Sequence, residues 1–336
     1  EIIRAVRAGA EGSNHRVQSA GSATAQEHAM KAIVQDRFGL PDVLELREID
    51  RPEAGDDQVL VRVKAASVNP ADWYAMVGAP YLARPQMGLR RPRSRLGIDL
   101  AGVVEAVGGR VTRLRVGDEV FGAGSGALAE HAAVAADALV PKPANLSFEQ
   151  AAAVPVAGLT ALQGLRDKGR AQPGQRVLIN GASGGVGTFA VQLAKSFGAE
   201  VTGVCSTRNL DLVASLGADH VIDYTHEDFT RGDQPYDLLL DVAGSRSWAD
   251  CRRVLGPRAT LVMVGAPKGN RLLGPLGHIV QVRLASLPAA LTTRMPTSVP
   301  SICPSMAFSA PTAQNTNWTA PAMVGNVPLT VTATDS

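Results

Sequence analysis

The chain has few cysteines and no excess of charge, and each absence excludes a class of protein. Only three of its 336 residues are cysteine, and no two of them lie close together in the sequence. A disulfide framework and a cysteine-rich zinc site are therefore excluded, and we expect a protein of the reducing cytoplasm. The 33 Lys and Arg residues nearly balance the 31 Asp and Glu residues, so the charge excess typical of nucleic-acid binding is missing. Five arginines lie in residues 84–95 without interleaved aromatic residues, which indicates an exposed loop rather than a binding site for bases.

Long apolar runs are missing as well. The longest apolar stretch, residues 151–162, is interrupted by Pro155 and Gly158, and it falls short of the roughly 20 residues that a membrane-spanning helix needs. We therefore expect a soluble protein whose partners are neither membranes nor nucleic acids. The hydrophobic content of 45% is enough for a folded core. Because the length exceeds what one core usually supports, we expect two domains.

The pattern of apolar residues divides the chain into four segments, of which two precede residue 151. Residues 1–29 are rich in Ala, Gly and Ser without periodicity, and we expect a disordered tail there. Residues 30–150 alternate between apolar and polar positions, with prolines and glycines between the runs, which predicts a domain rich in β-strands. Ser147 and Gln150 have the spacing of a helix capping box, and the domain boundary is placed directly after them.

Residues 151–287 form the next segment, in which strand-like and helix-like runs alternate after Ala171. Strands are predicted at 176–181, 200–206, 220–224, 236–244 and 259–265, and helices at 186–197, 209–216 and 246–255. This alternation predicts an α/β domain with a parallel, doubly wound sheet. Residues 288–336 carry 7 of the 21 prolines, and Arg294 is the only charged residue between 285 and 334. We expect this last segment to be an irregular, low-complexity tail.

The most informative motif is the glycine-rich run NGASGGVG at 180–187, between a predicted strand and a predicted helix. Its small residues follow the G-x-G-x-x-G spacing, with Ala at the first position. Small residues permit a tight turn, a close approach of backbone N–H groups to a pyrophosphate and close packing of the helix. The candidate cofactor-binding residues are Gly181, Ala182, Ser183, Gly184, Gly185, Val186 and Gly187. A purely structural turn and an inactive relic are the alternatives.

The end of the next predicted strand favours one nicotinamide cofactor over the other. NAD is usually held there by an acidic side chain that accepts the ribose hydroxyls, and this chain has no Asp or Glu at that place. Ser206, Thr207 and Arg208 offer donors and a cation instead, which suit the 2′-phosphate of NADPH. The alternative is that Arg208 simply begins an exposed helix. Val242 and Gly265, in the later predicted strands, are further cofactor-binding candidates.

Several stretches carry a family resemblance, among them SVNPADWY (67–74), LGIDLAGVVEAVG (96–108), RVGDEVFG (115–122), VPVAGLTAL (154–162) and GADHVIDY (217–224). From Met30 to about Ser286 the chain resembles the medium-chain dehydrogenase/reductase superfamily, specifically its zinc-independent quinone oxidoreductase branch, which includes ζ-crystallin-like proteins. The resemblance implies a GroES-like catalytic domain at 30–150 and a Rossmann domain at 151–287, with the reaction in the cleft between them. It also allows for a homodimer, which is common in this family.

The resemblance also implies roles for single residues. Asn69 and Tyr74 match positions that line the cleft in this branch, and Tyr81 lies in the adjacent loop; these three are the catalytic candidates. For the two tyrosines, a buried or surface position without a catalytic role is the alternative. Thr160 resembles a contact of the nicotinamide, and Tyr224 resembles a residue that packs near the adenosine phosphate. Asp99 is either an interior hydrogen-bonding strut or a substrate contact.

The zinc ligands of the zinc-dependent relatives are replaced in this chain. Asn69, Ile98 and Val156 stand where the resemblance places the ligands, and an amide and an aliphatic side chain cannot replace a thiolate and an imidazole at tetrahedral zinc. No metal is therefore expected. Without a Lewis acid, hydride transfer suits acceptors that are reduced easily, such as quinones and enones.

The expected function is thus an NADPH-dependent, zinc-independent reductase that acts on small quinones or other activated carbonyl compounds. The family pattern ends near Leu287, where a change of reading frame would explain the abrupt shift in composition. Because of this departure, a nucleotide-binding but catalytically impaired protein, or an interaction protein, stays open as the alternative.

Overall fold

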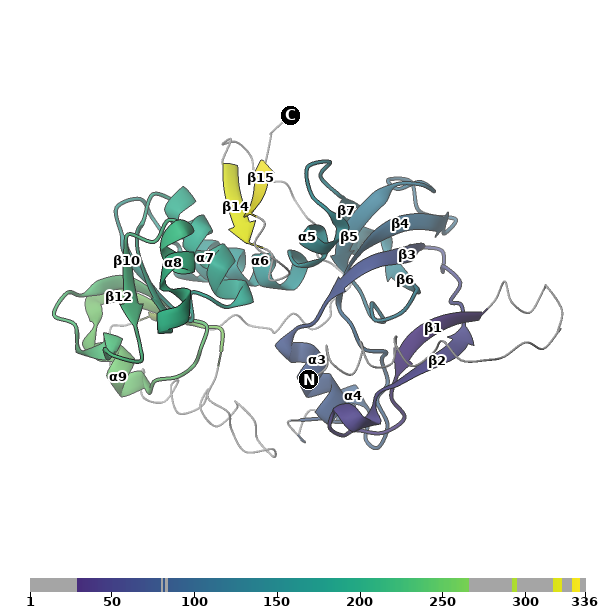
Figure 1. Cartoon of the computed structure of the whole chain (residues 1–336), viewed down its shortest axis with the longest axis horizontal. Coiled ribbons are helices and arrows are strands. Elements are labelled where there is room, and N and C mark those ends of the chain that lie inside the picture. Colours follow the sequence, from purple (N-terminus) through teal and green to yellow (C-terminus); the bar gives the residue numbers. More distant parts are fainter. Residues whose placement is uncertain are drawn as a thin grey trace. The chain divides into compact units, whose positions relative to one another are not determined.

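The structure, a computed structural model, describes residues 29–79, 81, 84–265, 292–294, 317–321 and 328–332. Along the described chain two compact units follow one another, and the division falls between Pro155 and Val156. Figure 1 colours the first unit from purple to teal and the second from teal through green to yellow. The tail predicted at 1–29 lies outside the described residues except for Ala29, which begins the first strand.

The first unit is built from antiparallel strands, as the alternation in the sequence predicts. Strands β1 (Ala29–Val34) and β2 (Glu45–Asp50) form a pair. A five-stranded sheet has the order β6-β3-β4-β5-β7 and consists of β3 (Gln58–Ser67), β4 (Asp99–Val107), β5 (Glu119–Ala123), β6 (His131–Ala135) and β7 (Leu139–Pro141). The helical segments are η1 (Pro41–Val43), α3 (Pro70–Val77), α4 (Arg84–Met87), η3 (Ala136–Ala138) and α5 (Phe148–Ala152).

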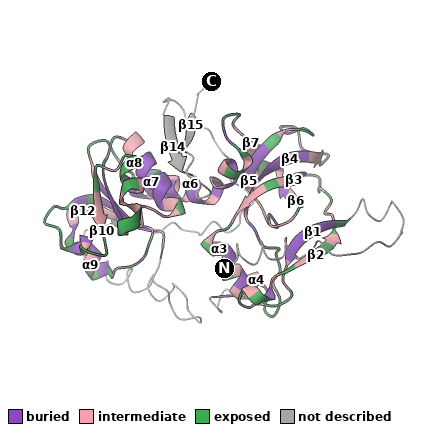
Figure 2. Cartoon of the chain, in the orientation of Figure 1, coloured by how far each residue is buried: buried purple, intermediate pink, exposed green. Residues whose placement is uncertain are grey.

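The five-stranded sheet carries the core of the first unit. Val59, Val61 and Leu100 are fully buried, and Figure 2 shows the buried parts of β3 and β4 in purple. Burial of such apolar side chains is the main stabilising contribution to a fold of this kind. In the register of the two strands, Ser67 at the end of β3 lies opposite Asp99 at the start of β4. The core strands therefore bring two polar residues together at the edge of the apolar region.

The second unit contains the predicted parallel sheet, which confirms the fold class. Its strands are β8 (Arg176–Asn180), β9 (Glu200–Cys205), β10 (His220–Asp223), β11 (Tyr236–Asp241), β12 (Leu255–Met263) and β13 (Thr292–Arg294), in the order β10-β9-β8-β11-β12-β13. All neighbouring pairs are parallel. The strand order reverses between β8 and β11, which is the switch point at which doubly wound sheets bind ligands beyond the carboxyl ends of their strands.

The helices of this unit agree with the predicted alternation. They are α6 (Pro155–Leu162), the π-helical η4 (Gln163–Gly169), α7 (Gly185–Ser196), η5 (Thr207–Asn209), α8 (Leu210–Ser215), η6 (Phe229–Arg231) and α9 (Trp248–Arg253). The helix predicted at 246–255 is shorter in the structure, because the Ser247 side chain caps its start and Leu255 already pairs with Tyr236 in the sheet. None of the described helices is long and apolar enough to cross a membrane.

Three short strands lie in the C-terminal segment that was expected to be irregular. β13 extends the parallel sheet beside β12, and β14 (Asn317–Pro321) pairs with β15 (Pro328–Thr332) in antiparallel fashion. For these strands the expectation is corrected: Thr and Val between the prolines favour extended backbone, and the pairing satisfies backbone groups that face the partner strand. The rest of residues 288–336 lies outside the described residues.

The capping box predicted from the sequence is confirmed at the start of α5. Ser147 Oγ accepts a hydrogen bond from Gln150 N at 3.2 Å, and Gln150 Oε1 accepts one from Ser147 N at 2.8 Å. Such reciprocal bonds satisfy N–H groups that have no partner within the helix. They fix the start of α5, which is the last helix of the first unit before the division after Pro155.

Replacement of Ser147 by Ala removes the side-chain acceptor of this box and is expected to lower the free energy of unfolding by about 1 kcal/mol. The measurement is urea denaturation of the full chain. Ser147→Thr keeps a hydroxyl at the same position and serves as the matched control. Equal denaturation midpoints for the Ala and Thr variants would show that the cap contributes nothing.

Candidate functional site

The glycine-rich run forms a tight turn between β8 and α7. Gly181 has a φ of +90°, a conformation that favours glycine. Its N–H and that of Ala182 both donate to Val204 O, at 3.1 and 3.0 Å, which ties the turn to β9. A Cβ added to Gly187 would lie 2.1 Å from Gly181 O, so the first turn of α7 approaches the loop closely enough that only glycine fits.

The start of α7 is open in the direction where a ligand would approach. Gly184 is the N-cap residue, and no side chain caps the helix there. A Cβ added to Gly184 would meet no heavy atom closer than 3.4 Å, and one added to Gly185 none closer than 3.8 Å. The first N–H groups of a helix lack partners within it and lie at the positive end of its dipole, so they bind anions. The residues present here therefore fit the diphosphate of a dinucleotide.

A buried hydrogen-bond network holds the strand ends next to this turn. Its members are not among the site residues predicted from the sequence. Asn180 Nδ2 donates to Asp241 Oδ1 at 2.8 Å and to Ser245 Oγ at 3.1 Å, and Gly244 N donates to Asp241 Oδ1 at 2.9 Å. Asn180 and Asp241 are almost fully buried. Each ends one of the two strands at the switch point, β8 and β11, and this shared position is the signal by which they could have been found.

The same network brings Val242 and Gly265 to the motif. Val242 N donates to Asn180 O at 2.9 Å, and Gly265 N donates to Asp241 O at 3.0 Å. A Cβ on Gly265 would lie 2.0 Å from Val242 O, so β12 ends in close contact with the loop after β11. Both candidates therefore lie at the carboxyl edge of the sheet together with the glycine-rich turn.

The loop after β9 lies beside the glycine-rich turn and is joined to it by Asn209. This residue was not predicted from the sequence. Asn209 Nδ2 donates to Ser183 Oγ at 3.1 Å and to Ser206 Oγ at 3.2 Å. The Thr207 hydroxyl donates to Asp223 Oδ2 at 2.5 Å. Arg208 is exposed, and it forms no ion pair with any side chain in the described part of the chain. Its guanidinium group is therefore available for an anionic ligand.

The two remaining candidates of this unit lie on other elements. Tyr224 follows β10 directly, its N–H donates to Cys205 O at 3.1 Å, and 54% of its surface is exposed. The contact with Cys205 places Tyr224 at the same sheet edge as Ser206. Thr160 is half-buried on α6.

In the first unit, Asn69 is held by two aspartates. Asn69 Nδ2 donates to Asp99 Oδ2 at 3.1 Å, and Ser67 Oγ donates to the same oxygen at 3.0 Å. Asp99 is fully buried. Of its two interpretations, the geometry supports the interior strut. Because a buried carboxylate needs hydrogen-bond donors, the amide of Asn69 is fixed in orientation.

The second aspartate, Asp72, orients the backbone around Asn69. Its Oδ2 accepts from Asn69 N at 2.8 Å and its Oδ1 from Gly97 N at 3.0 Å. Burial raises the pKa of the Asp72 carboxyl, while the hydrogen bonds from Asn69 and Gly97 oppose this shift. Asp72 thus joins the start of α3 to the loop before β4. Neither Ser67 nor Asp72 was singled out from the sequence, although both lie in the SVNPADWY stretch.

The tyrosines are partly exposed, and Tyr81 is held by an arginine. Tyr74 on α3 is 43% exposed and Tyr81 is 40% exposed. The Arg84 guanidinium lies 4.4 Å from the ring centre of Tyr81 and 4.8 Å from that of Phe38, and its Nε donates to Gly78 O at 3.0 Å. Arg84 was expected to belong to an exposed loop. The expectation is wrong for this residue, because stacking on two rings holds it half-buried.

Comparison with known proteins shows the same division of the chain. Residues 55–144 match the alcohol dehydrogenase GroES-like domain, and residues 185–287 match the zinc-binding dehydrogenase domain. The 2-methylene-furan-3-one reductase of Solanum lycopersicum is 38% identical over 73% of this chain and 65% of its own length. A quinone oxidoreductase of Pseudomonas aeruginosa is 37% identical over 69% of this chain and 72% of its own length.

A solved structure agrees with these matches. The Escherichia coli quinone oxidoreductase complexed with NADPH is 29% identical and superimposes with a TM-score of 0.67, over 80% of this chain and 81% of that chain. The chain belongs to the medium-chain dehydrogenase/reductase superfamily. Within the superfamily it falls in the quinone oxidoreductase branch, as the sequence motifs indicated.

The resemblance places the zinc ligands of other superfamily members at Asn69, Ile98 and Val156, and the side chains of these residues are poorly suited to the metal. The Asn69 amide is committed to Asp99, and Ile98 and Val156 have no donor atom. Among the residues that the structure describes, no group of three or more His, Cys, Asp or Glu side chains could hold a metal ion. An amide nitrogen and two aliphatic side chains do not form a zinc site.

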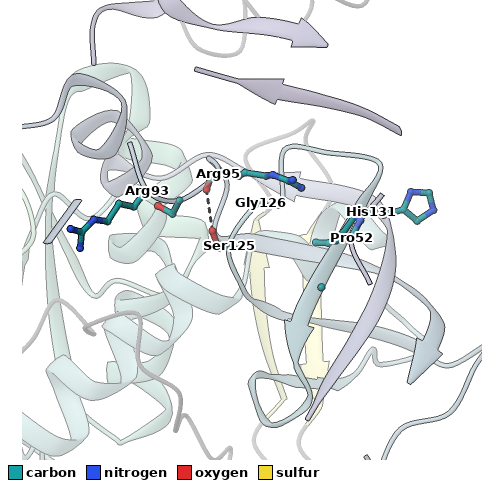
Figure 3. A pocket seen from close by; sticks show the side chains of 9 residues that line it. Pro52, Arg93, Arg95, Ser125, Gly126 and His131 are labelled. Atoms are coloured by element: carbon teal, nitrogen blue, oxygen red, sulfur yellow. Dashed lines mark hydrogen bonds between the residues drawn. The ribbon is translucent and has the colours of Figure 1, made fainter. Parts of the chain in front are cut away.

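A shallow hollow in the first unit contains none of the candidate residues. Figure 3 shows its lining, which includes Arg93, Arg95, Ser125 and His131, around a volume of about 330 Å³. The two arginine side chains point in opposite directions in this view, and Ser125 Oγ donates to Arg95 O at 3.2 Å. The cations do not converge on one point, so this hollow lacks the geometry of an anion site.

Two glycines of the turn, Gly187 and Gly185, are expected to respond differently to an added methyl group. Gly187→Ala places a Cβ against Gly181 O and is expected to lower the free energy of unfolding by about 1–3 kcal/mol, the range typical of overpacking. Gly185→Ala adds the same methyl group where the nearest atom is Ala157 Cβ at 3.8 Å, and it is expected to leave stability unchanged. Thermal unfolding of the two variants tests this difference. Equal melting temperatures would contradict the close approach of α7 to the loop.

Proposed function

We propose that the protein is an NADPH-dependent, zinc-independent reductase of quinones and other activated carbonyl compounds such as enones. One observation carries the cofactor assignment: the open start of α7 lies beside a loop that offers Ser206 and Arg208, whose exposed guanidinium forms no ion pair with any residue that the structure describes. No acidic side chain ends β9, where NAD enzymes hold the ribose hydroxyls. The NADPH bound to the Escherichia coli relative supports the same choice.

The substrate class rests on the relatives and on the chemistry of the first unit. The Solanum lycopersicum and Pseudomonas aeruginosa relatives are named as a furanone reductase and a quinone oxidoreductase. Both substrate classes have a conjugated carbonyl group, which accepts a hydride without a metal to polarise it. The donor set around Asn69 does not suit zinc, and this supports a reaction of that kind.

Bound NADPH would supply the hydride. The protein residues then have two tasks, which are to hold the cofactor and to stabilise the substrate oxygen as it gains negative charge. For the first task we assign the backbone N–H groups of residues 183–187 to the diphosphate, Ser206 and Arg208 to the 2′-phosphate, and Thr160 to the nicotinamide end. For the second we assign the amide of Asn69 and the hydroxyl groups of Tyr74 and Tyr81 as donors.

The orientation of Asn69 is part of this proposal. Its Nδ2 carries two hydrogens: one is directed to Asp99 Oδ2 at 3.1 Å, and the further contact of this nitrogen with Ser67 Oγ, at 3.5 Å, is long for a hydrogen bond. Because Asp99 is buried and also accepts from Ser67, the amide cannot rotate without leaving a carboxylate short of a donor. A donor that is oriented before the substrate arrives stabilises developing charge at a lower reorganisation cost than water does.

The function is tested with the purified full chain, NADPH and 1,4-benzoquinone, by following the nicotinamide absorbance band at about 340 nm. Oxidation of NADPH that depends on both enzyme and quinone is expected, and an enone such as 3-penten-2-one serves as the second acceptor. Tight NADPH binding without turnover of either acceptor would favour the alternative, a nucleotide-binding but catalytically impaired protein. The reason for that alternative is the departure from the family pattern after Leu287, where the match to the dehydrogenase domain also ends.

Two further expectations accompany this proposal. The scarcity of cysteine favours a cytoplasmic location, and the family favours a homodimer. Both remain predictions.

Arg208→Ala is expected to weaken NADPH binding by about 1.5–3 kcal/mol, the contribution of a hydrogen bond to a charged group, and to leave NADH binding nearly unchanged. The measurement is the dissociation constant of each cofactor, from the fluorescence of the bound nicotinamide. Arg252→Ala removes another exposed arginine, from α9, and is the matched control. Tighter binding of NADH than of NADPH by the unmodified protein would overturn the cofactor assignment.

Exhaustive chelation with EDTA or 1,10-phenanthroline is expected to leave quinone reduction unchanged, because the residues at the zinc positions offer no suitable ligands. Elemental analysis of the active protein is expected to find no stoichiometric zinc. Loss of turnover on chelation, with recovery on addition of zinc, would disprove the metal-independent reaction.

A further inference from the structure

A single carboxylate joins two of the loops at the carboxyl edge of the parallel sheet. Asp223, the last residue of β10, accepts from Thr207 Oγ1 at 2.5 Å in the loop after β9. It also accepts from Thr225 N at 2.9 Å and Thr225 Oγ1 at 2.7 Å, and its Oδ2 lies 3.0 Å from His226 Nδ1. The side chain is only 13% exposed. Asp223 therefore holds the turn that follows its own strand to the turn that follows β9.

The link continues to the glycine-rich turn. Arg208 stands between Thr207, which is bound to Asp223, and Asn209, which is bound to Ser183 and Ser206. Both neighbours of Arg208 are thus fixed, while its own side chain is exposed and forms no ion pair within the described chain. Because Thr207 and Asn209 are both held by hydrogen bonds, the backbone of Arg208 is fixed, and this limits the region that its guanidinium group can reach.

We propose that Asp223 is a positioning residue that sets the preference for NADPH, because it holds Thr207, and with it Arg208, where the 2′-phosphate binds. This inference rests on the proposed function, and it assigns Asp223 no contact with the cofactor itself. The hydrogen bond from Thr207 is the main reason why the pKa of the Asp223 carboxyl lies well below its usual range. The carboxylate therefore stays charged, and remains an acceptor, at every pH at which the enzyme would work.

Three possible roles of Asp223 predict different changes in the binding of a 2′-phosphate when its carboxylate is removed. A negative charge near a phosphate repels it, so if Asp223 acted only through its charge, removing that charge would strengthen binding of a 2′-phosphate. If Asp223 acts by holding Thr207 and Arg208 in place, its removal weakens binding of the same group. A merely structural role predicts a third result, which is an equal loss for ligands with and without the 2′-phosphate.

The test uses the full chain and two adenosine ligands that cannot react, so that binding is measured without turnover. Adenosine 2′,5′-bisphosphate carries the 2′-phosphate and 5′-AMP lacks it, and both dissociation constants are measured by isothermal titration calorimetry. In Asp223→Asn we expect the bisphosphate to bind about tenfold more weakly, the loss expected when one hydrogen bond to a charged group is no longer held in place. Binding of 5′-AMP is expected to stay unchanged.

Two variants of Thr207 test the same hydrogen bond from its other side. Thr207→Val replaces the hydroxyl by a methyl group of similar shape and is expected to reproduce the loss seen in Asp223→Asn. Thr207→Ser keeps the hydroxyl and is expected to retain the selectivity of the unmodified protein. If Asp223→Asn fails to fold, the Val and Ser pair still tests whether the Thr207 hydroxyl, which donates to Asp223, is required for the selectivity.

Asp219→Asn is the matched control, because Asp219 directly precedes the opposite end of β10. It accepts from Lys195 Nζ and from Val201 N, both at 2.7 Å, so its loss perturbs the strand to a similar degree without touching the loop after β9. This variant is expected to melt at a lower temperature with an unchanged ratio of the two dissociation constants.

The outcomes separate this inference from the proposed function. If the unmodified protein binds both ligands equally, the NADPH assignment fails, and the positioning role fails with it. If the unmodified protein prefers the bisphosphate but Asp223→Asn tightens its binding, or weakens both ligands alike, only the positioning role is overturned. A selective loss in Asp223→Asn and Thr207→Val, absent from Asp219→Asn and Thr207→Ser, supports it.

Discussion

The approach of α7 to the turn after β8 is the constraint on which the second unit depends. Gly187 lies so close to Gly181 O that no side chain fits between them, and this contact sets both the position and the direction of the helix. The open positions at Gly184 and Gly185 follow from it, because a helix placed in this way directs its uncapped first turn beyond the carboxyl edge of the sheet. The same edge receives the ends of β9, β10, β11 and β12. The proposed cofactor site and the packing of the sheet therefore share one set of backbone contacts.

The elements of the fold were predictable from the sequence where periodicity is strong. The alternation after residue 171 predicted the parallel sheet, and the capping box at Ser147 and Gln150 was found at its predicted place. The reversal of strand order at β8 and β11 follows from the doubly wound arrangement and not from any local pattern. Composition alone was a weaker guide, since proline content suggested irregular structure where β14 and β15 pair. Strand pairing depends on hydrogen bonds between backbone N–H and C=O groups, and the amino-acid composition of a segment does not show whether these bonds form.

The candidate site was predictable only in part, and the physical reason is distance along the chain. The glycine-rich turn is local, so its spacing is visible in the sequence. Asp241 lies 61 residues from Asn180, and Asp99 lies 30 residues from Asn69, and no spacing rule connects partners so far apart. Arg84 was misjudged for the same reason, because the ring of Phe38 that helps to hold it belongs to another part of the chain.

Buried carboxylates play the same part in both units. Asp99 and Asp72 orient Asn69 and the backbone around it, and Asp241 holds the glycine-rich turn at which the diphosphate is proposed to bind. An apolar side chain would be easier to bury at these places, because a carboxylate in the interior is stable only when donors surround it. That requirement is also what makes a carboxylate useful, since it fixes the direction of each donor that it accepts. A site that must present an amide or an N–H group in one orientation therefore needs a buried acceptor, because apolar side chains cannot fix the direction of a donor.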